Sequence, residues 1–444
     1  MTEALALPRR DDRPQRRGPT SASPRLSGRQ IAVVGLGYVG LPTALSLHDA
    51  GAAVSGIDID EVRLTAIRAQ DVDLLGGDVA RLQVALAGER LTLSTSAAAI
   101  RGADTVIVCV PTPVDRERHP DPRALRAACE ANVAHARPGQ LLLLSSTTYV
   151  GCTQELLVAP LAERGLRAGT DVHVAFAPER INPGDSAFRQ MAVPRVVGGA
   201  TPRCRERASE ILAAITAEVH EVSSMEVAEL TKLYENTFRA VNLALANEMA
   251  DATVMFGLDP VEVIDAAATK PYGFLRHYPG PGVGGHCIPV DPHYLLEPMH
   301  EMGGAAPIIE QAMQAIDDRP ARVAERAIEI LRERGPDPAK ASVLIVGMAY
   351  KPGIADVRES PGLELAVQLA RAGVSVAYHD DLVPSVTLTE GAVLHTIAEP
   401  DPDRFDLVIV AGLRKAADYD WLERCQDLLD ATYRAPGGDR RHLL

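Results

Sequence analysis

One cysteine, Cys287, stands in a segment whose composition suits covalent chemistry. Residues 278–292 read YPGPGVGGHCIPVDP, and this density of glycine and proline excludes a helix or an ordinary strand. Such a segment forms a fixed loop whose backbone can come close to a ligand. A cysteine at its end is placed to act as a nucleophile if its thiolate is stabilised. The alternative is a structural thiol in a turn, the interpretation we favour for the other five cysteines.

A second group of polar residues falls in a stretch without glycine or proline, residues 225–256. Lys232, Asn236 and Arg239 are spaced i, i+4, i+7 and therefore share one face of the long helix that this stretch predicts. They could supply polar partners for a site, or they could form a solvated charged stripe. A second side of the helix is marked by Val227, Leu230, Tyr234, Val241, Leu245 and Glu248.

A glycine pattern near the N-terminus predicts a dinucleotide site. Gly35, Gly37 and Gly40 fit GxGxxG, with Tyr38 and Val39 between them, directly after an apolar strand at residues 31–35 and before a helix. The glycines would let the backbone approach a pyrophosphate at the helix N-terminus. Asp58, 18 residues past Gly40, ends the next strand and would bind a ribose 2′-hydroxyl, which favours NAD over NADP. Arg63 would cover the adenine. The alternatives are a turn that binds nothing and a site for another nucleotide such as FAD.

Composition limits the classes of partner. The chain of 444 residues carries a formal charge of −14, which argues against a nucleic-acid or membrane-surface role. An anionic ligand would therefore need a local basic pocket. The six cysteines show no CxxC pair or metal-like spacing, so we expect reduced thiols, no metal and a cytoplasmic location. No apolar run is long enough to predict a transmembrane helix.

The order of elements predicts an α/β protein. Strands alternate with helices from residue 30 to about 218, which indicates a parallel, doubly wound sheet. A helical region follows, and a second strand–helix alternation begins near residue 341. We expect two Rossmann-like doubly wound domains joined by a central helical domain with a long connecting helix. The expected divisions are a disordered tail at 1–29, a dinucleotide-binding domain at 30–218, a central domain at 219–320 and a last domain at 321–444.

Five motifs in order resemble the UDP-glucose/GDP-mannose dehydrogenase family over residues 29–434. They are VGLGYVGLP at 34–42, APERINPG at 177–184, KLYENTFR at 232–239, GGHCIPVDP at 284–292 and GMAYKPGIADVRESP at 347–361. The resemblance implies a four-electron oxidation of a UDP-sugar at C6, with two NAD+ consumed. Cys287 would trap the aldehyde as a thiohemiacetal, and oxidation to a thioester and hydrolysis would follow.

The resemblance also implies roles for individual residues. Lys232 and Asn236 would stabilise the oxyanion, Asp291 would orient the lysine or a water, and Glu179 would activate the hydrolytic water. Thr112, and Thr147 or preferably Thr148, would lie near the nicotinamide, although strand-end capping also explains them. Arg358 would reach NAD from the last domain. The residues expected to bind the UDP-sugar are Arg180, Ile181, Arg239, Gly284, Tyr350 and Lys351.

The motif variants favour UDP-N-acetylglucosamine as the sugar, with UDP-N-acetylmannosamine and UDP-glucose as alternatives. Two segments depart from the family pattern. AGLRK at 411–415 stands where the family often has Thr-x-His, and DATYR at 430–434 places a basic residue two positions late. Both lie in the last domain, where the family binds UDP. We also keep two rival functions, a two-electron alcohol dehydrogenase and a non-catalytic binding protein, and we expect a homodimer or higher oligomer.

Overall fold

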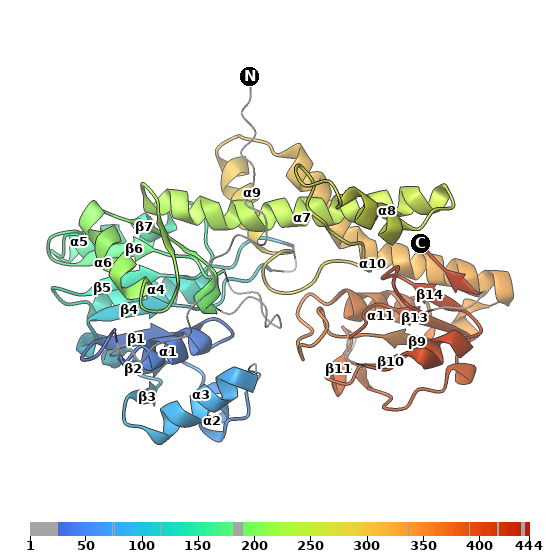
Figure 1. The fold of residues 1–444 in the computed structure, drawn as a ribbon, viewed down its shortest axis with the longest axis horizontal. Coiled ribbons are helices and arrows are strands. Elements are labelled where there is room, and N and C mark those ends of the chain that lie inside the picture. The colour runs from blue at the N-terminus through green and yellow to red at the C-terminus, as the bar shows by residue number, and fades with distance from the viewer. Residues whose placement is uncertain are drawn as a thin grey trace.

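The structure is a computed structural model. It describes residues 25–72, 74, 76–115, 117–180, 190–335, 337–389, 391–414, 417–436 and 440–444. Figure 1 shows two α/β units side by side, with the long helix α7 (Met225–Met255) running along one side of both. Most of the expected N-terminal tail lies outside the described residues, but Leu26 is already buried in the core of the first unit.

The first unit is built on an eight-stranded sheet with the order β3-β2-β1-β4-β5-β6-β7-β8. Neighbouring strands are parallel except β6 and β7, which are antiparallel. Apolar clusters cover both faces, which explains why β4 and β5 are continuously apolar and buried. The strands are β1 (Gln30–Val34), β2 (Ala53–Ile57), β3 (Leu91–Ser94), β4 (Thr105–Val108), β5 (Leu141–Leu144), β6 (His173–Phe176), β7 (Arg195–Gly199) and β8 (Val219–Glu221).

Helices connect these strands and pack on the two faces of the sheet. They are α1 (Gly40–Asp49), α2 (Glu61–Ala69), α3 (Gly76–Ala87), α4 (Arg123–His135), α5 (Ala159–Glu163) and α6 (Pro202–Leu212). A π-helical turn (Gln154–Val158) leads into α5, and 3-10 turns occur at Ala97–Gly102 and Gln190–Ala192.

The middle of the chain is helical. The side chain of Ser224 caps α7 by accepting from the backbone N–H of Val227 at 3.3 Å. The following helices are α8 (Pro260–Ala267), α9 (Asp291–Glu301) and α10 (Pro307–Arg334). The expected division at residues 320 and 321 falls inside α10, which packs on α7 and on the second unit. Among the described residues, no helix is both long and apolar enough to cross a membrane.

The second unit has a parallel five-stranded sheet with the order β10-β9-β13-β14-β15. Its strands are β9 (Ser342–Val346), β10 (Ser375–His379), β13 (Leu407–Val410), β14 (Leu428–Asp430) and β15 (Arg441–His442). A short antiparallel pair, β11 (Ser385–Thr387) and β12 (Val393–His395), is not part of this sheet but lies next to its edge strand β10. Helix α11 (Pro361–Arg371) and 3-10 turns at Pro338–Lys340, Pro402–Arg404 and Asp420–Arg424 complete the unit. The predicted fold class is confirmed.

Candidate active site

The glycine turn after β1 is shaped by close backbone contacts. Gly35 has φ 87°, and a Cβ there would lie 2.6 Å from the carbonyl oxygen of Cys109. A Cβ on Gly40 would lie 1.7 Å from the carbonyl oxygen of Gly35, so only glycine fits at the start of α1. Gly37, in contrast, has open space where its Cβ would point. The turn therefore leaves a backbone surface free at a helix N-terminus, which fits the pyrophosphate of a dinucleotide.

Asp58 and Arg63 lie beside this turn. The Asp58 carboxylate accepts from the backbone N–H of Leu36 at 2.8 Å and of Asp60 at 3.0 Å. The Nε of Arg63 donates to the carbonyl of Leu36 at 3.0 Å. Both side chains are half-buried, so they can also contact a ribose and an adenine from the edge of β2.

The second unit contacts the glycine turn through Arg358. Its guanidinium lies 4.9 Å from the ring centre of Tyr38, pairs with Asp356 at 2.6 Å and donates to Nδ1 of His286 at 3.2 Å. The neighbouring Glu359 has φ 50°, a left-handed conformation, and its carboxylate pairs with Arg118 of the first unit at 2.7 Å. Val39 immediately precedes α1.

The glycine-rich segment forms the Cys287 loop, which we define as residues 278–290. The backbone N–H of Gly285 donates to the carbonyl of Arg358 at 3.0 Å. A Cβ on Gly284 would lie 2.5 Å from the carbonyl oxygen of Glu359. One on Gly285 would lie 2.7 Å from the ring of Tyr350. The glycines thus allow the loop to lie directly against the second unit.

A buried carboxylate lies at the end of this loop. Asp291 is 1% exposed and begins α9, and its backbone N–H donates to the carbonyl of Cys287 at 2.7 Å. Its side chain accepts hydrogen bonds from Asn236 of α7 and from Thr147, which follows β5. Burial raises the pKa of Asp291 to about 6, against the opposing effect of the Lys232 cation. Two separate elements, α7 and the segment after β5, therefore converge on one carboxylate at the start of a third, α9.

The thiol of Cys287 is held in the same surroundings. Burial, with a smaller contribution from Asp291, raises its pKa to about 11. The cations of Lys232, Arg358 and Arg239 oppose that rise, so all three favour the thiolate. Burial lowers the pKa of His286 to about 4, so this imidazole is neutral at pH 7 and accepts from Arg358. The resting cysteine is accordingly a thiol beside cations that can stabilise its anion.

Three family models match the chain in order. They are described as the NAD binding domain, the central domain and the UDP binding domain of the UDP-glucose/GDP-mannose dehydrogenase family. They match residues 29–216, 226–317 and 344–433. The chain belongs to the UDP-glucose/GDP-mannose dehydrogenase family. The predictions of an NAD-dependent nucleotide-sugar dehydrogenase, of NAD as cofactor and of a UDP-binding last domain are confirmed.

Relatives of this dehydrogenase cover most of its length. Protein CapL of Staphylococcus aureus is 35% identical over 355 residues, which are 79% of this chain and 82% of CapL. The UDP-N-acetyl-D-glucosamine 6-dehydrogenase of Pseudomonas aeruginosa is 33% identical over 385 residues, 86% and 90% of the two chains. The structure of a UDP-D-ManNAc dehydrogenase from Pyrococcus horikoshii superposes with a TM-score of 0.85 at 28% identity, covering 93% of this chain and 98% of that one.

Two expected residues of the dehydrogenase are already paired with partners that the sequence did not reveal. Glu179, 7% exposed, forms an ion pair with the buried Arg195 of β7. Arg180 binds both carboxylate oxygens of Glu235 at 2.5 and 3.1 Å and donates to the carbonyl of Pro194 at 2.8 Å. Because Glu235 lies on α7 next to Asn236 in the sequence, this pair joins the segment after β6 to α7.

The two threonines differ in position. Thr112 is half-buried, and its side chain donates a hydrogen bond to the hydroxyl of Tyr294 on α9. That hydroxyl donates in turn to the carbonyl of Pro113 at 3.0 Å. Thr148 is 1% exposed and lies beside the thiol of Cys152. Its neighbour Thr147 makes the hydrogen bond with Asp291, so Thr147 faces the buried carboxylate next to the Cys287 loop.

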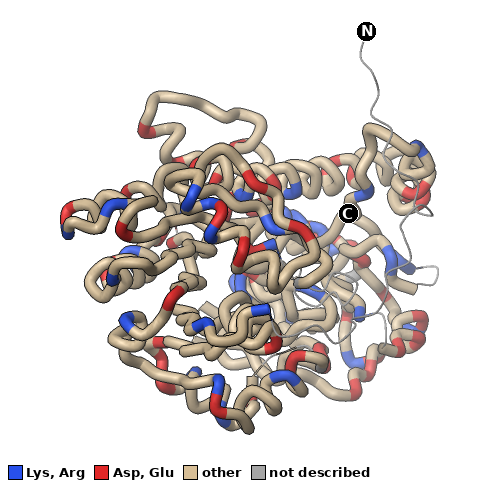
Figure 2. The backbone as a smooth tube through the Cα atoms, turned by 60° about the vertical axis from the view of Figure 1, so that its left-hand side comes forward, with Lys and Arg blue, Asp and Glu red and all other residues tan. Residues whose placement is uncertain are grey.

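The remaining residues expected at the sugar-nucleotide site lie at the junction of the units. Arg239 is exposed on α7, one helical turn beyond Asn236. Tyr350 and Lys351 lie in the segment after β9, where the Tyr350 N–H donates to the carbonyl of Asp356 at 2.9 Å. Ile181 lies outside the described residues. Figure 2 shows basic and acidic residues interspersed over the whole chain, and no group of potential metal ligands occurs among the described residues.

Proposed function

We propose that this dehydrogenase oxidises the C6 alcohol of a UDP-N-acetylhexosamine to a carboxylate through a thioester on Cys287. The observation that carries the proposal is the convergence of Asn236, Thr147 and Lys232 on the carboxylate of Asp291, directly beside that thiol. A two-electron alcohol dehydrogenase needs no nucleophile, and the Cys287 loop would then have no chemical use.

The cofactor has a site of suitable character. The open side of Gly37, the carboxylate of Asp58 and the guanidinium of Arg358 would contact its pyrophosphate, ribose and nicotinamide side. When bound, NAD supplies the acceptor for each of the two hydrides that leave C6. Two NAD+ and one water are consumed for each sugar.

The protein's own residues handle the protons and the oxygen atom. Lys232 and Asn236 stabilise negative charge on O6 while the alcohol loses its proton. The sulfur of Cys287 then bonds to C6 of the aldehyde, and its proton passes to O6 to give a thiohemiacetal. After the second oxidation, water adds to the thioester, the C–S bond breaks and the proton returns to sulfur. Because the pKa of Cys287 is raised, the addition of its sulfur to C6 is coupled to the transfer of the thiol proton.

Glu179 is the proposed base for the hydrolytic water. Its pairing with Arg195 fixes its orientation, and its second carboxylate oxygen accepts from the backbone N–H of Arg180 at 2.8 Å. Arg180, held by Glu235, is proposed to contact the sugar at the same point. Thr112 and Thr147 are proposed to lie near the nicotinamide, with Thr147 acting through Asp291.

The favoured substrate is UDP-N-acetylglucosamine. The motif PERINPG at 178–184 resembles the branch of the family that acts on UDP-N-acetylhexosamines, and KPYGF at 270–274 and YPGPG at 278–282 resemble its UDP-N-acetylglucosamine enzymes. A relative named for that activity aligns with 86% of the chain. UDP-N-acetylmannosamine is the alternative, because the structure with TM-score 0.85 carries that name. NADH absorbance measured with UDP-N-acetylglucosamine, UDP-N-acetylmannosamine and UDP-glucose tests the order, and a higher kcat/KM with UDP-glucose contradicts it.

The decisive test of the mechanism is Cys287→Ser. We expect it to abolish carboxylate formation while NAD affinity stays near that of the native chain, since serine is nearly isosteric but far less nucleophilic. The native enzyme should release two NADH per sugar. Cys425→Ser, at a half-buried cysteine of the second unit, is the matched control and should leave both values unchanged. An undiminished carboxylate yield from Cys287→Ser contradicts the thioester, and one NADH per sugar supports the two-electron alternative.

We also propose a homodimer formed through α7. In the single chain one side of this helix exposes large apolar residues along its length, and water-exposed patches of this kind mark interfaces. They are Val227, Leu230, Tyr234, Phe238, Leu245 and Met249. Light scattering of the native chain should give twice the chain mass, and Leu245→Arg should give a monomer. A native monomer at micromolar concentration contradicts the proposal.

A further inference from the structure

The turn at residues 430–435, which follows β14, is built around a buried carboxylate. Asp430 is 0% exposed and accepts from the backbone N–H groups of Thr432 at 2.9 Å and Ala435 at 2.8 Å. The guanidinium of Arg441 pairs with it at 2.6 Å. Tyr433 takes φ 61°, a region that favours glycine, so the turn holds this residue in a conformation of higher energy. This is also the segment whose basic residue, Arg434, departs from the family spacing.

The hydroxyl of Tyr433 reaches the interface between α7 and α10. It donates to Asp251 at 3.1 Å and accepts from Nη2 of Arg319 at 2.9 Å. Arg319 is 1% exposed, and its Nη1 contacts both carboxylate oxygens of Asp251, at 2.8 and 2.7 Å. A buried guanidinium with these partners has little freedom to move, because each lost hydrogen bond leaves an unpaired polar group.

Arg319 also holds the beginning of the Cys287 loop. Its Nε donates to the carbonyl of Gly280 at 3.3 Å, and the backbone N–H of the same glycine donates to Asn247 of α7 at 2.9 Å. Tyr278 lies two residues before Gly280 in the loop, and its ring centre is 3.6 Å from the guanidinium of Arg434. The turn therefore contacts the loop twice, once through Arg319 and once directly.

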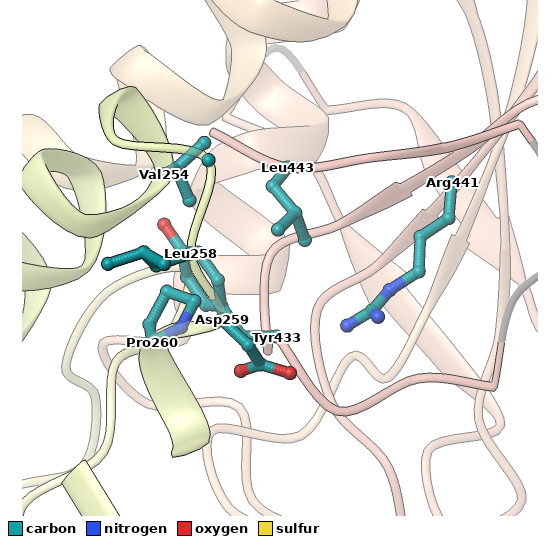
Figure 3. Close-up of a pocket in the computed structure, with 8 residues that line it drawn as sticks. Val254, Leu258, Asp259, Pro260, Tyr433, Arg441 and Leu443 are labelled. Carbon is teal, nitrogen blue, oxygen red and sulfur yellow. The ribbon is translucent and has the colours of Figure 1, made fainter. Parts of the chain in front are cut away.

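Tyr433 is itself buried, with 3% of its surface exposed. Figure 3 shows the cavity that it borders, which has a volume of about 350 Å³. Its other lining residues are Val254, Gly257, Leu258, Asp259, Pro260, Arg441 and Leu443. Because the hydroxyl of Tyr433 is buried between Asp251 and Arg319, removing it would leave both groups without that hydrogen-bond partner.

We propose that the turn at residues 430–435 positions the Cys287 loop, Tyr433 acting through Arg319 and Arg434 through Tyr278. The turn thereby couples the UDP-binding unit to the thiol. The inference rests on the proposed function of Cys287. Neither residue touches the reacting atoms, so both are positioning residues. Loosening the start of the loop admits water to a thiol whose pKa burial has raised, which increases its thiolate fraction and disturbs its alignment with C6.

The test compares Tyr433→Phe with Tyr378→Phe. Tyr378 is a buried tyrosine of the same unit, and its hydroxyl donates to the carbonyl of Val383 at 2.9 Å, away from the loop. The rate at which iodoacetamide alkylates Cys287 is followed against pH by peptide mass spectrometry. We expect Tyr433→Phe to raise this rate at least about threefold near neutral pH, which corresponds to a pKa lower by roughly half a unit. It should also lower kcat without changing the KM for NAD, and Tyr378→Phe should do neither.

Native alkylation rates and native kcat in a folded Tyr433→Phe protein overturn the proposal. If that variant unfolds at the assay temperature, Arg434→Gln replaces it, because Arg434 is exposed and its loss should not unfold the unit. Faster alkylation in Arg434→Gln then supports the proposal, and a native rate overturns it. Alkylation requires no turnover, so these outcomes are independent of the Cys287→Ser experiment, which alone decides the thioester.

Discussion

The two α/β units begin with the same structural device. In the first, β1 ends at Gly35 with φ 87°, and the N–H of Leu36 donates to Asp58 at the end of β2. In the second, β9 ends at Gly347 with φ 92°, and the N–H groups of Met348 and Ala349 donate to Asp380 at the end of β10, at 2.8 and 2.9 Å.

The units differ in the length of chain between this glycine and the next helix. In the first, helix α1 starts at Gly40, so the chain leaves the turn at once and the side of Gly37 stays open. In the second, α11 starts only at Pro361, and the intervening residues carry Tyr350, Arg358 and Glu359 toward the Cys287 loop and the first unit. Under the proposed function, the first turn would bind a ligand with its backbone, and the second would extend a loop that completes the site.

The largest effect should come from Gly40→Ala. The new Cβ would lie 1.7 Å from the Gly35 carbonyl oxygen, and neither backbone can yield, so the cost exceeds about 3 kcal/mol and the first unit should not fold. Circular dichroism and melting of the purified variant measure this. Gly37→Ala is the control, since its Cβ meets no atom within 4 Å. It should fold but bind NAD weakly, and a folded, active Gly40→Ala contradicts our description of the turn.

The next largest effect should distinguish the roles of Asp58 in the first unit and Asp380 in the second. Asp58→Ala should raise the Kd of NAD by about tenfold or more, the value of one or two hydrogen bonds to a charged group. Asp380→Ala should leave NAD affinity nearly unchanged and weaken UDP binding, because Asp380 supports only the second turn. Calorimetric titration with NAD and with UDP measures both. Equal losses of NAD affinity in the two variants would show that the turns are not functionally distinct.

A pH dependence should arise at Asp291, where the units meet. Burial raises its pKa to about 6, so the carboxylate that accepts from Asn236 and Thr147 is present above pH 6 and lost below it. We expect kcat/KM to fall by up to about tenfold for each pH unit below 6. In Asp291→Asn the activity should be low and this acidic limb absent. An identical acidic limb in the variant assigns it to another group.

The same shift predicts an effect on stability. Because the folded pKa lies above that of the unfolded chain, protonation of Asp291 contributes stability that is fully present at low pH and lost as the pH rises through about 6. Asp291→Asn should therefore raise Tm at about pH 8 relative to the native chain, and by less at about pH 4. A lower Tm at both values contradicts the assigned cause.

The smallest effect should come from Arg118→Gln, which removes a contact between the units. Arg118 pairs with Glu359 and with Asp317 of α10, both at 2.7 Å, but all three side chains are partly exposed. Such exposed pairs typically contribute only about 0.3 kcal/mol each, so losing both should change KM values by less than about threefold. The difference should vanish at about 1 M salt, where screening is strong. A larger or salt-independent change indicates a direct role in binding.

Sequence patterns predicted which residues lie together when they belong to one turn motif or to one face of a helix. The GxGxxG spacing located Gly35 and Asp58 correctly with respect to each other, and the helical spacing of Lys232 and Asn236 identified the face that meets Asp291. Partners on distant elements left no such signal. Arg195 pairs with Glu179 from another strand. Thr147, and not its neighbour Thr148, contacts Asp291, because the sequence of a strand end predicts where the segment lies but not which side chain points to the site. The Gly347 and Asp380 pair repeats the pattern of the first unit and could have been found.

The left-handed peptide at Glu359 has a consequence for access. It lets two consecutive side chains, Arg358 and Glu359, contact separate points of the first unit, the Tyr38 ring and the Arg118 guanidinium. The two contacts share one backbone, so moving the units apart must release both in the same event. Because the dinucleotide and the sugar nucleotide are both proposed to bind between these units, a separation that breaks the two contacts would expose both proposed sites together.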